Sequence, residues 1–157
     1  LNKLLIRILL HLQVEFSYLE AGKELYHWTK SCLQDSADYL YFDNISLDGK
    51  INETKFQYNS GQMLQAASLL YKQTGEKEYL TDAHNLAKAC NDYFFEDFQT
   101  EENHNFRALK NGNIWFVAIM LRGFEELYQI DKNPVYLNNF KETLVYMWKH
   151  CWALSPS

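Results

Sequence analysis

The sequence contains few of the residues that form turns, with six Gly and two Pro among 157 residues. This argues against a β-sandwich, which needs a turn after every short strand. Lys and Arg (15) are outnumbered by Asp and Glu (20) and are scattered, so the basic surface that nucleic acids or anionic membranes require is missing. No run of about 20 apolar residues is present, which excludes a membrane-spanning helix.

Metal-binding motifs are missing as well. The three cysteines form no CxxC pair, and none lies in a Cys/His cluster with zinc-site spacing. Asp43, Asp48 and Glu53 share one segment, but their order does not match a calcium-binding loop. We therefore expect neither a metal site nor a cofactor.

The sequence does contain a repeated helical pattern. A Tyr-Leu pair begins at Tyr18, Tyr79 and Tyr136, at intervals of about 60 residues, which is typical of repeat proteins. Each pair is expected to open an amphipathic helix with apolar residues at positions i, i+3, i+4 and i+7. Ser17, with a Glu three residues later, and Asn133, followed by Pro, supply the start signals of the first and third of these helices.

The helix before each Tyr-Leu pair is more apolar than the helix after it. Residues 114–121 are apolar without a break, and apolar residues nearly encircle the segment 63–71. Such helices are buried on all sides, so the pattern predicts an inner and an outer helix layer. Residues 2–15 are predicted as another largely buried helix rather than a signal peptide, because polar residues interrupt them every four positions.

These alternating helices predict an all-α fold of helical-hairpin repeats that forms part of an (α/α)6 toroid. Six hairpins of roughly 60 residues would close such a ring, and the sequence contains three. We therefore predict one helical-repeat domain over residues 1–157, the C-terminal half of a larger toroid. A self-contained three-hairpin solenoid is the alternative, which is less favoured because repeats need neighbours to cover their apolar ends.

Long segments, residues 34–57 and 97–111, connect the hairpins at one end of the array. Residues 39–45 and 51–58 resemble short strands around an Asp-Gly turn, whereas the second segment is predicted as a loop. Long ordered loops on a rigid scaffold often carry binding residues.

Aromatic, carboxylate and amide side chains gather in these segments and at the inner-helix N-termini. Aromatic faces stack on sugar rings, and acids and amides bond to hydroxyl groups, so the combination favours a carbohydrate ligand. Two structural alternatives remain, namely that Asn59 and Asn113 only cap helices and that Trp115 belongs to the core. The predicted substrate-binding residues are Asp43, Asn44, Tyr58, Asn59, Gln62 and Trp115.

The stretch FQYNSGQM at residues 56–63 resembles the Tyr-x-Tyr-Asn-x-Gly segment of glycoside hydrolase family 76. As in that family, a helix, a Tyr-x-x-Thr-Gly-Glu turn at residues 71–76 and a Tyr-Leu helix start follow. Residues 41–45 stand where the family has an aromatic-Asp-x-Ile segment, and residues 112–128 resemble its next inner helix. The resemblance covers about residues 35–130.

This resemblance implies an (α/α)6 toroid that cleaves α-1,6-linked mannan internally and retains the anomeric configuration. Retention needs two carboxyl groups about 5–5.5 Å apart. The family carries them as an adjacent Asp-Asp pair, and no such pair occurs in this sequence. The adjacent acids at 101–102 and 125–126 are expected to be solvated or structural. We therefore expect no catalytic residue here, with the pair lying upstream of Leu1.

The sequence thus predicts part of a glycoside hydrolase that supplies one wall of a mannan cleft. Its expected partners are a polysaccharide or oligosaccharide, and the missing N-terminal half or a second copy of the chain. The resemblance also implies a secreted or cell-surface protein. The main alternative is a non-catalytic helical-repeat module that binds glycan or protein. A sugar epimerase ranks last, because such enzymes use cleft histidines and only His104 lies in a loop.

Overall fold

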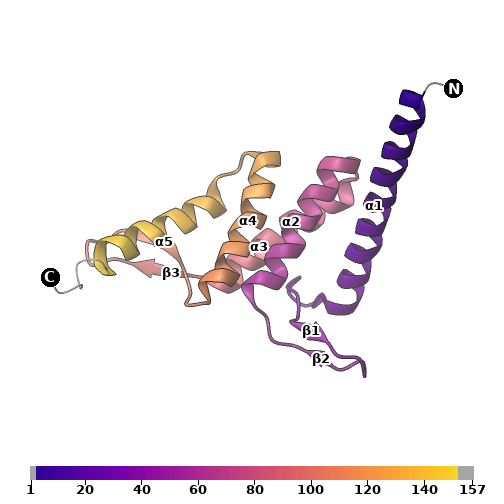
Figure 1. Ribbon diagram of the computed structural model, residues 1–157. Helices are drawn as coiled ribbons and strands as arrows, with labels where there is room; N and C mark the ends of the chain where they lie inside the picture. Colours follow the sequence, from indigo (N-terminus) through magenta and orange to yellow (C-terminus); the bar gives the residue numbers. More distant parts are fainter. Residues whose placement is uncertain (1–2, 152–157) are drawn as a thin grey trace.

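The computed structural model describes the backbone of residues 3–151 and the side chains of residues 18–150. This part of the chain is mostly helical, which confirms the all-α class, and two small β-hairpins lie between the helices (Figure 1). In chain order the elements are α1 (Lys3–Leu33), β1 (Asn44–Ile45), β2 (Ile51–Asn52), α2 (Gln57–Thr74), α3 (Lys77–Phe94), β3 (Phe95–Gln99), β4 (Asn105–Leu109), α4 (Ile114–Asp131) and α5 (Val135–Cys151).

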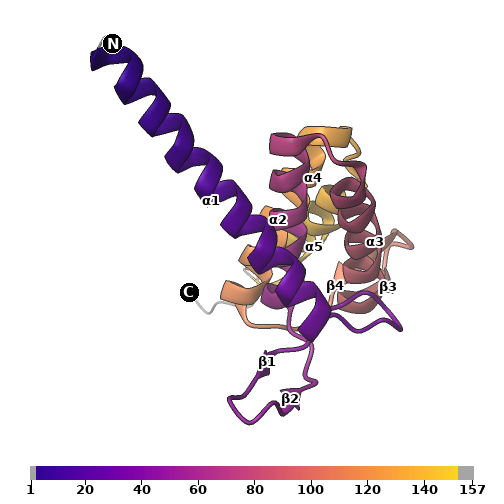
Figure 2. The ribbon, with the colours of Figure 1, turned by 90° about the vertical axis from the view of Figure 1, so that its right-hand side faces the viewer.

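Helices α2 and α4 form the inner layer and run side by side in the same direction (Figures 1 and 2). Near their C-terminal ends, the Lys72 ammonium of α2 donates to the Glu126 carboxylate of α4 at 2.7 Å. Helix α3 packs against α2, and α5 packs against α4 and β4. The α2–α3 and α4–α5 pairs are the predicted second and third helical hairpins.

The expectation that residues 114–121 are buried on all sides is wrong for α4. Val117 and Met120 are buried against the core, but Ile114 and Trp115 are exposed. An apolar helix is buried only where a neighbour covers it, and in the described part of the chain the neighbours of α4 lie on one side.

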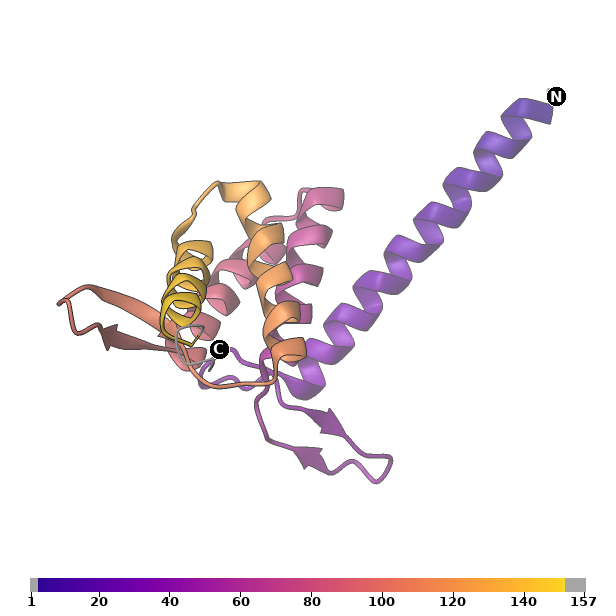
Figure 3. The ribbon, with the colours of Figure 1, turned by 60° about the vertical axis from the view of Figure 1, so that its left-hand side comes forward.

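The predicted first hairpin is also wrong. Helix α1 continues without a break through Ser17 and Tyr18, so no helix starts there and Ser17 is not an N-terminal cap. A capping residue acts only where the backbone leaves the helical conformation, and the sequence has no Gly or Pro before Gly22 to cause that. The N-terminal half of α1 projects away from the other helices (Figures 2 and 3), and the predicted burial of residues 2–15 lies outside the described side chains.

The C-terminal half of α1 is attached to α3 by polar contacts between side chains. The Tyr26 hydroxyl donates to the Asp82 carboxylate at 2.9 Å, and the Lys30 ammonium bonds to the same oxygen. The Lys23 ammonium pairs with Glu76 at 2.7 Å at the start of α3. These contacts fix the angle at which α1 meets the two hairpins.

In both helical hairpins, the first helix ends at a residue in the left-handed conformation. Gly75 ends α2 in the left-handed conformation, with φ +73°, and its N–H donates to the Tyr71 carbonyl at 2.8 Å. Lys132 ends α4 in the same way. The Asn133 side chain then accepts from the Val135 N–H at 3.2 Å, which confirms the predicted start signal of α5.

The two connecting segments each contain a β-hairpin. Strands β1 and β2 pair antiparallel around the Asp-Gly turn, where Gly49 has φ +83°, but they are shorter than predicted. Residues 97–111, predicted as a loop, contain most of a five-residue ladder between β3 and β4. The rings of Phe98 and Phe106 meet edge to face across this ladder, with their centroids 5.4 Å apart, and both pack on Tyr146 of α5. The hairpin is therefore stabilised by a contact distant in sequence.

The inner helices approach so closely that their backbones touch. A Cβ atom at Gly61 would lie 2.5 Å from the Met120 Cα, and one at Gly123 would lie 2.6 Å from the Gly61 carbonyl oxygen. Both distances are below any normal contact, and the obstructing atoms are backbone. Glycine is therefore required at both positions.

We predict that Gly61→Ala destabilises the protein by about 1–3 kcal/mol, because the added methyl forces α2 and α4 apart. Gly22→Ala is the matched control, since Gly22 lies in a helix with no atom within 4 Å of its added Cβ. It should stabilise the protein by about 0.5–1 kcal/mol. Urea unfolding monitored by circular dichroism gives both values, and an unchanged midpoint for Gly61→Ala would contradict this packing.

Candidate functional site

The segment before β1 is held in place by an ion-pair cluster and by the first turn of α2. The Lys55 ammonium donates to Asp35 at 2.6 Å and to Asp38 at 2.8 Å. The hydrogen bond from Lys55 holds the pKa of Asp35 below its usual range. The buried hydroxyl of Ser60 accepts from the Tyr41 N–H at 3.1 Å. These contacts fix the backbone that leads into Asp43.

Asp43 is the centre of a hydrogen-bonded cluster. Its Oδ1 accepts from the Tyr58 hydroxyl, and its Oδ2 accepts from Asn44 Nδ2 at 2.7 Å and from Asn52 Nδ2 at 3.1 Å. The Asn59 amide donates to the Asp43 backbone carbonyl at 3.1 Å. Four predicted residues therefore meet here. Asn52 was missed, although the β1–β2 register places it directly opposite Asn44.

Asp43 stabilises the protonated form of Tyr58. The hydrogen bond to the Asp43 carboxylate, assisted by burial, raises the pKa of Tyr58 above its usual value. At neutral pH the Tyr58 hydroxyl is the donor in this hydrogen bond. Among the described residues, no ion pair to Asp43 occurs, so its charge is balanced by hydrogen bonds alone. A carboxylate accepts about four hydrogen bonds, which leaves capacity for a ligand hydroxyl.

A cavity of about 570 Å3 lies beside this cluster, between α1 and α2. Asp43, Tyr58, Asn59 and Gln62 line it, and α1 contributes Leu25 and other residues. Asn59 Oδ1 is buried and has no hydrogen-bond partner within the described part of the chain. An orphaned buried acceptor is costly unless a bound molecule or water satisfies it. Because Asp43 also lines the cavity and retains one acceptor position, the cavity is suited to a ligand that donates hydrogen bonds.

Trp115 is the one predicted site residue that neither joins the hydrogen-bonded cluster around Asp43 nor lines the cavity beside it. It lies in the first turn of α4 and is 76% exposed, so the alternative that it belongs to the core is wrong. The ring of its neighbour Phe116 packs on Tyr58 at 4.6 Å between centroids. Asn113 caps α4 by accepting from the Trp115 N–H at 2.9 Å, whereas Asn59 lies inside α2 and caps nothing.

Other candidate groups lie away from the cavity. Glu126 is paired with Lys72 near the C-terminal ends of the inner helices, while Glu101 and Glu102 are exposed at the tip of the β3–β4 hairpin. His104 contacts Glu142 of α5 at 3.2 Å. Within residues 18–150, no three His, Cys, Asp or Glu side chains are grouped to hold a metal ion. No helix in the described chain has the length and apolar character needed to cross a membrane.

A family model described as glycosyl hydrolase family 76 matches residues 6–155, almost the whole chain. This chain belongs to glycosyl hydrolase family 76. The match confirms the resemblance seen at the Tyr-x-Tyr-Asn-x-Gly segment. No match was found among curated proteins.

Solved structures of family 76 proteins share both the sequence and the fold. A glycoside hydrolase from a bovine Bacteroides thetaiotaomicron strain is 40% identical, with a TM-score of 0.80, and the match covers 89% of this chain and 31% of that one. A family 76 mannosidase of B. thetaiotaomicron VPI-5482 is 38% identical, with a TM-score of 0.79, and the match covers 84% of this chain and 37% of that one. An α-1,6-mannanase of Salegentibacter sp. HEL1_6, inactivated at two adjacent aspartates and bound to α-1,6-mannotetraose, is 31% identical, with a TM-score of 0.65 and coverages of 92% and 43%.

These relatives confirm that the helical hairpins have the fold of part of the (α/α)6 toroid of family 76 glycoside hydrolases. The chain spans less than half the length of each of these structures. Its two complete hairpins and α1 correspond to one portion of the ring.

We predict that Asp43→Asn lowers the pKa of Tyr58 toward the ordinary value for tyrosine, because the hydrogen bond to a carboxylate is removed together with the nearby negative charge. Because the pKa of Tyr58 is higher in the folded than in the unfolded protein, protonated Tyr58 stabilises the fold. This stabilisation is complete below the unfolded pKa, near pH 10, and is lost as the pH rises through the folded pKa. Carbon-13 NMR titration of labelled tyrosines measures this pKa directly. Asp97→Asn on β3 is the control and should leave it unchanged, whereas an unaltered Tyr58 titration in Asp43→Asn would rule out the predicted coupling.

Proposed function

We propose that this chain forms one wall of the α-1,6-mannan cleft of a family 76 glycoside hydrolase. In this proposal the cavity beside Asp43 holds sugar residues, and another part of the full-length protein supplies the catalytic carboxylates. In the same proposal, residues 1–157 form one helical-repeat domain that makes up about half of a toroid. The cluster around Asp43 is the observation that carries it.

The chemistry of the cavity supports a sugar ligand. Asp43 retains one position that accepts a hydrogen bond, and the amide groups of Asn59 and Gln62 can both donate and accept hydrogen bonds. A pyranose presents hydroxyl groups that satisfy both kinds of partner. The stacked rings of Tyr58 and Phe56 provide an aromatic surface next to these polar groups. The Salegentibacter relative binds a ligand of this class.

The same cluster supports a binding role for Asp43 rather than a catalytic one. A retaining glycosidase needs two carboxyl groups about 5–5.5 Å apart. The hydrogen bonds of Asp43 in the described chain come from amide and hydroxyl groups, and no second carboxyl group takes part. The sequence has no adjacent Asp pair, whereas replacement of such a pair inactivates the Salegentibacter enzyme. We therefore assign hydrolysis to the complete protein.

The exposed apolar residues next to the cavity fit this arrangement. Leu25 and Trp28 on α1 are 64% and 52% exposed, and Leu25 lines the cavity. In a closed toroid, a helix face of this kind is covered by the neighbouring repeat. We propose that a preceding hairpin of the same protein covers it and brings the catalytic pair toward Asp43. A second copy of this chain is the alternative occupant.

Calorimetric titration with α-1,6-mannotetraose tests the binding role. We predict weak binding to the 157-residue protein and a loss of about tenfold or more in Asp43→Ala, because a charged hydrogen-bond acceptor is removed. Asp97→Ala, which removes an exposed carboxylate on the β3–β4 hairpin, is the matched control and should bind like the unaltered protein. Equal affinities for all three proteins would refute the assignment of Asp43.

Incubation of the same protein with α-1,6-mannan tests the catalytic part of the proposal. We predict no new reducing ends, because the chain lacks the paired carboxylates that cleavage requires. Release of oligosaccharides by the chain alone, abolished in Asp43→Ala, would instead make Asp43 catalytic. The two assays are independent, so binding without cleavage is the specific expectation.

A further inference from the structure

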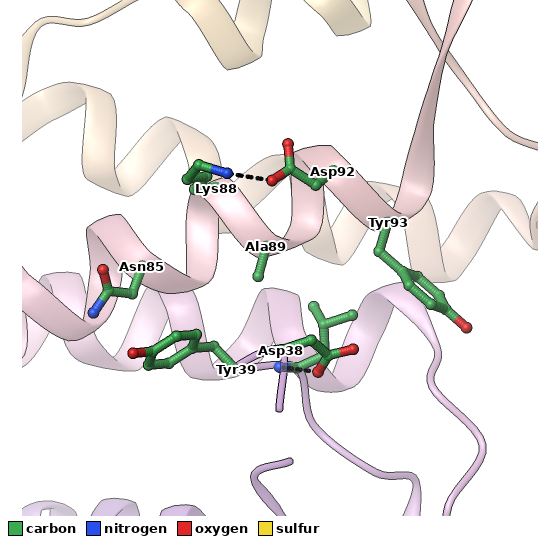
Figure 4. A pocket seen from close by; sticks show the side chains of 8 residues that line it. Asp38, Tyr39, Asn85, Lys88, Ala89, Asp92 and Tyr93 are labelled. Atoms are coloured by element: carbon green, nitrogen blue, oxygen red, sulfur yellow. Dashed lines mark hydrogen bonds and ion pairs between the residues drawn. The ribbon is translucent and has the colours of Figure 1, made fainter. Parts of the chain in front are cut away.

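A second hollow lies on the outer side of the structure, away from the Asp43 cavity. It is a groove of about 360 Å3 between α3 and residues 38–40, shown in Figure 4. This volume falls within the range of small-ligand sites, roughly 300–1,000 Å3. The groove and the Asp43 cavity have no lining residue in common, so they are separate sites.

Two tyrosines mark the ends of this groove. Tyr39 and Tyr93 are each 47% exposed, although both belong to segments packed on the core. Figure 4 shows their side chains at opposite ends of the groove, with Asp38 and Ala89 between them. The Tyr93 ring is held edge-on against Phe94 at 4.9 Å between centroids. A half-exposed ring held in this way, such as Tyr93, provides a flat apolar face at little entropy cost for ordering it.

Tyr39 is placed in the groove by an unusual backbone conformation. Its φ is +67°, in the left-handed region that tyrosine rarely adopts. The Tyr39 N–H donates to the Asp35 carbonyl at 2.9 Å, and Gln34 Nε2 donates to the Tyr39 carbonyl at 3.1 Å. The Lys55 ion pairs with Asp35 and Asp38 hold the same turn. Strain that the surroundings maintain in this way is concentrated at functional sites.

The charges around the groove are of both signs. Asp92 is paired with Lys88 at the rim, Asp38 shares Lys55 with Asp35, and the Lys110 ammonium lies over the Tyr93 ring, 5.8 Å from its centroid. The groove therefore has no strong charge of one sign that would select an ionic ligand. The side chain of Asn85, for which the described residues provide no hydrogen bond, adds a free amide on the side of α3 that faces Tyr39 (Figure 4). The combination suits a neutral ligand with hydroxyl groups and apolar ring faces.

We propose that the groove between Tyr39 and Tyr93 is a second carbohydrate-binding site, which holds a neutral glycan on the outer surface. Sugar rings stack on the two tyrosines, and their hydroxyl groups bond to Asn85 and to the remaining acceptor positions of Asp38. This site goes beyond the proposed cleft function, since it contains no cavity residue of the Asp43 cluster. Its role is to keep a polysaccharide chain attached to the protein outside the cleft.

Amide chemical-shift titration of the full 157-residue protein tests this site, with α-1,6-mannotetraose and cellotetraose as separate probes. We expect at least one sugar to shift the amides of residues 38–40 and 85–93. Binding in the Asp43 cavity is expected to shift different amide signals, those of residues 43 and 58–62. A failure of either site is therefore visible independently of the other.

The decisive variant is Tyr39→Gly, which deletes the ring and relieves the left-handed strain, so the protein should remain at least as stable. It should weaken sugar binding at the groove by about fivefold, as expected when one aromatic contact is lost. Tyr93→Ala should have a similar effect, and Tyr128→Ala, on α4, is the control that leaves the groove unaffected. Absence of shifts in residues 85–93 with both sugars, or unchanged groove affinity in Tyr39→Gly, would overturn the proposal.

Discussion

The contact between the backbones of α2 and α4 at Gly61 and Gly123 is the constraint on which the site depends. Tyr58 and Asn59 lie within one turn of Gly61, and Phe116 lies one turn before Met120, which Gly61 touches. The close approach therefore brings the Phe116 ring to 4.6 Å from the Tyr58 ring. Tyr58 in turn meets Asp43. A contact that is purely steric thus sets the position of the polar cluster.

The loop that carries Asp43 has little regular structure of its own. Its two-residue strands would not hold it in place, so its position comes from contacts with rigid elements. Ser60 holds Tyr41, Tyr58 holds the Asp43 side chain, and Lys55 joins the two acids earlier in the segment. The site is therefore a loop supported by the N-terminus of an inner helix, and it should be as ordered as that helix.

The sequence was sufficient to predict the features that depend on local signals. The α2–α3 and α4–α5 hairpins, the turn at Gly75 and the cap at Asn133 each rest on a few neighbouring residues. The grouping of Asp43, Tyr58, Asn59 and Gln62 followed from placing a loop beside a helix start. The continuous α1 could not be foreseen from Ser17, because a capping sequence does not show whether the backbone leaves the helix. The β3–β4 hairpin depends on Tyr146 of α5, and the exposure of Trp115 depends on which neighbours surround α4, so neither was visible locally.

A crystal structure of the 157-residue protein with α-1,6-mannotetraose would test the central claim most directly. We predict sugar density in the cavity between α1 and α2, with a sugar hydroxyl group within hydrogen-bonding distance of the Asp43 carboxylate. Density confined to other surfaces, with the Asp43 cluster unoccupied, would contradict the assignment of this cavity as a wall of the mannan cleft.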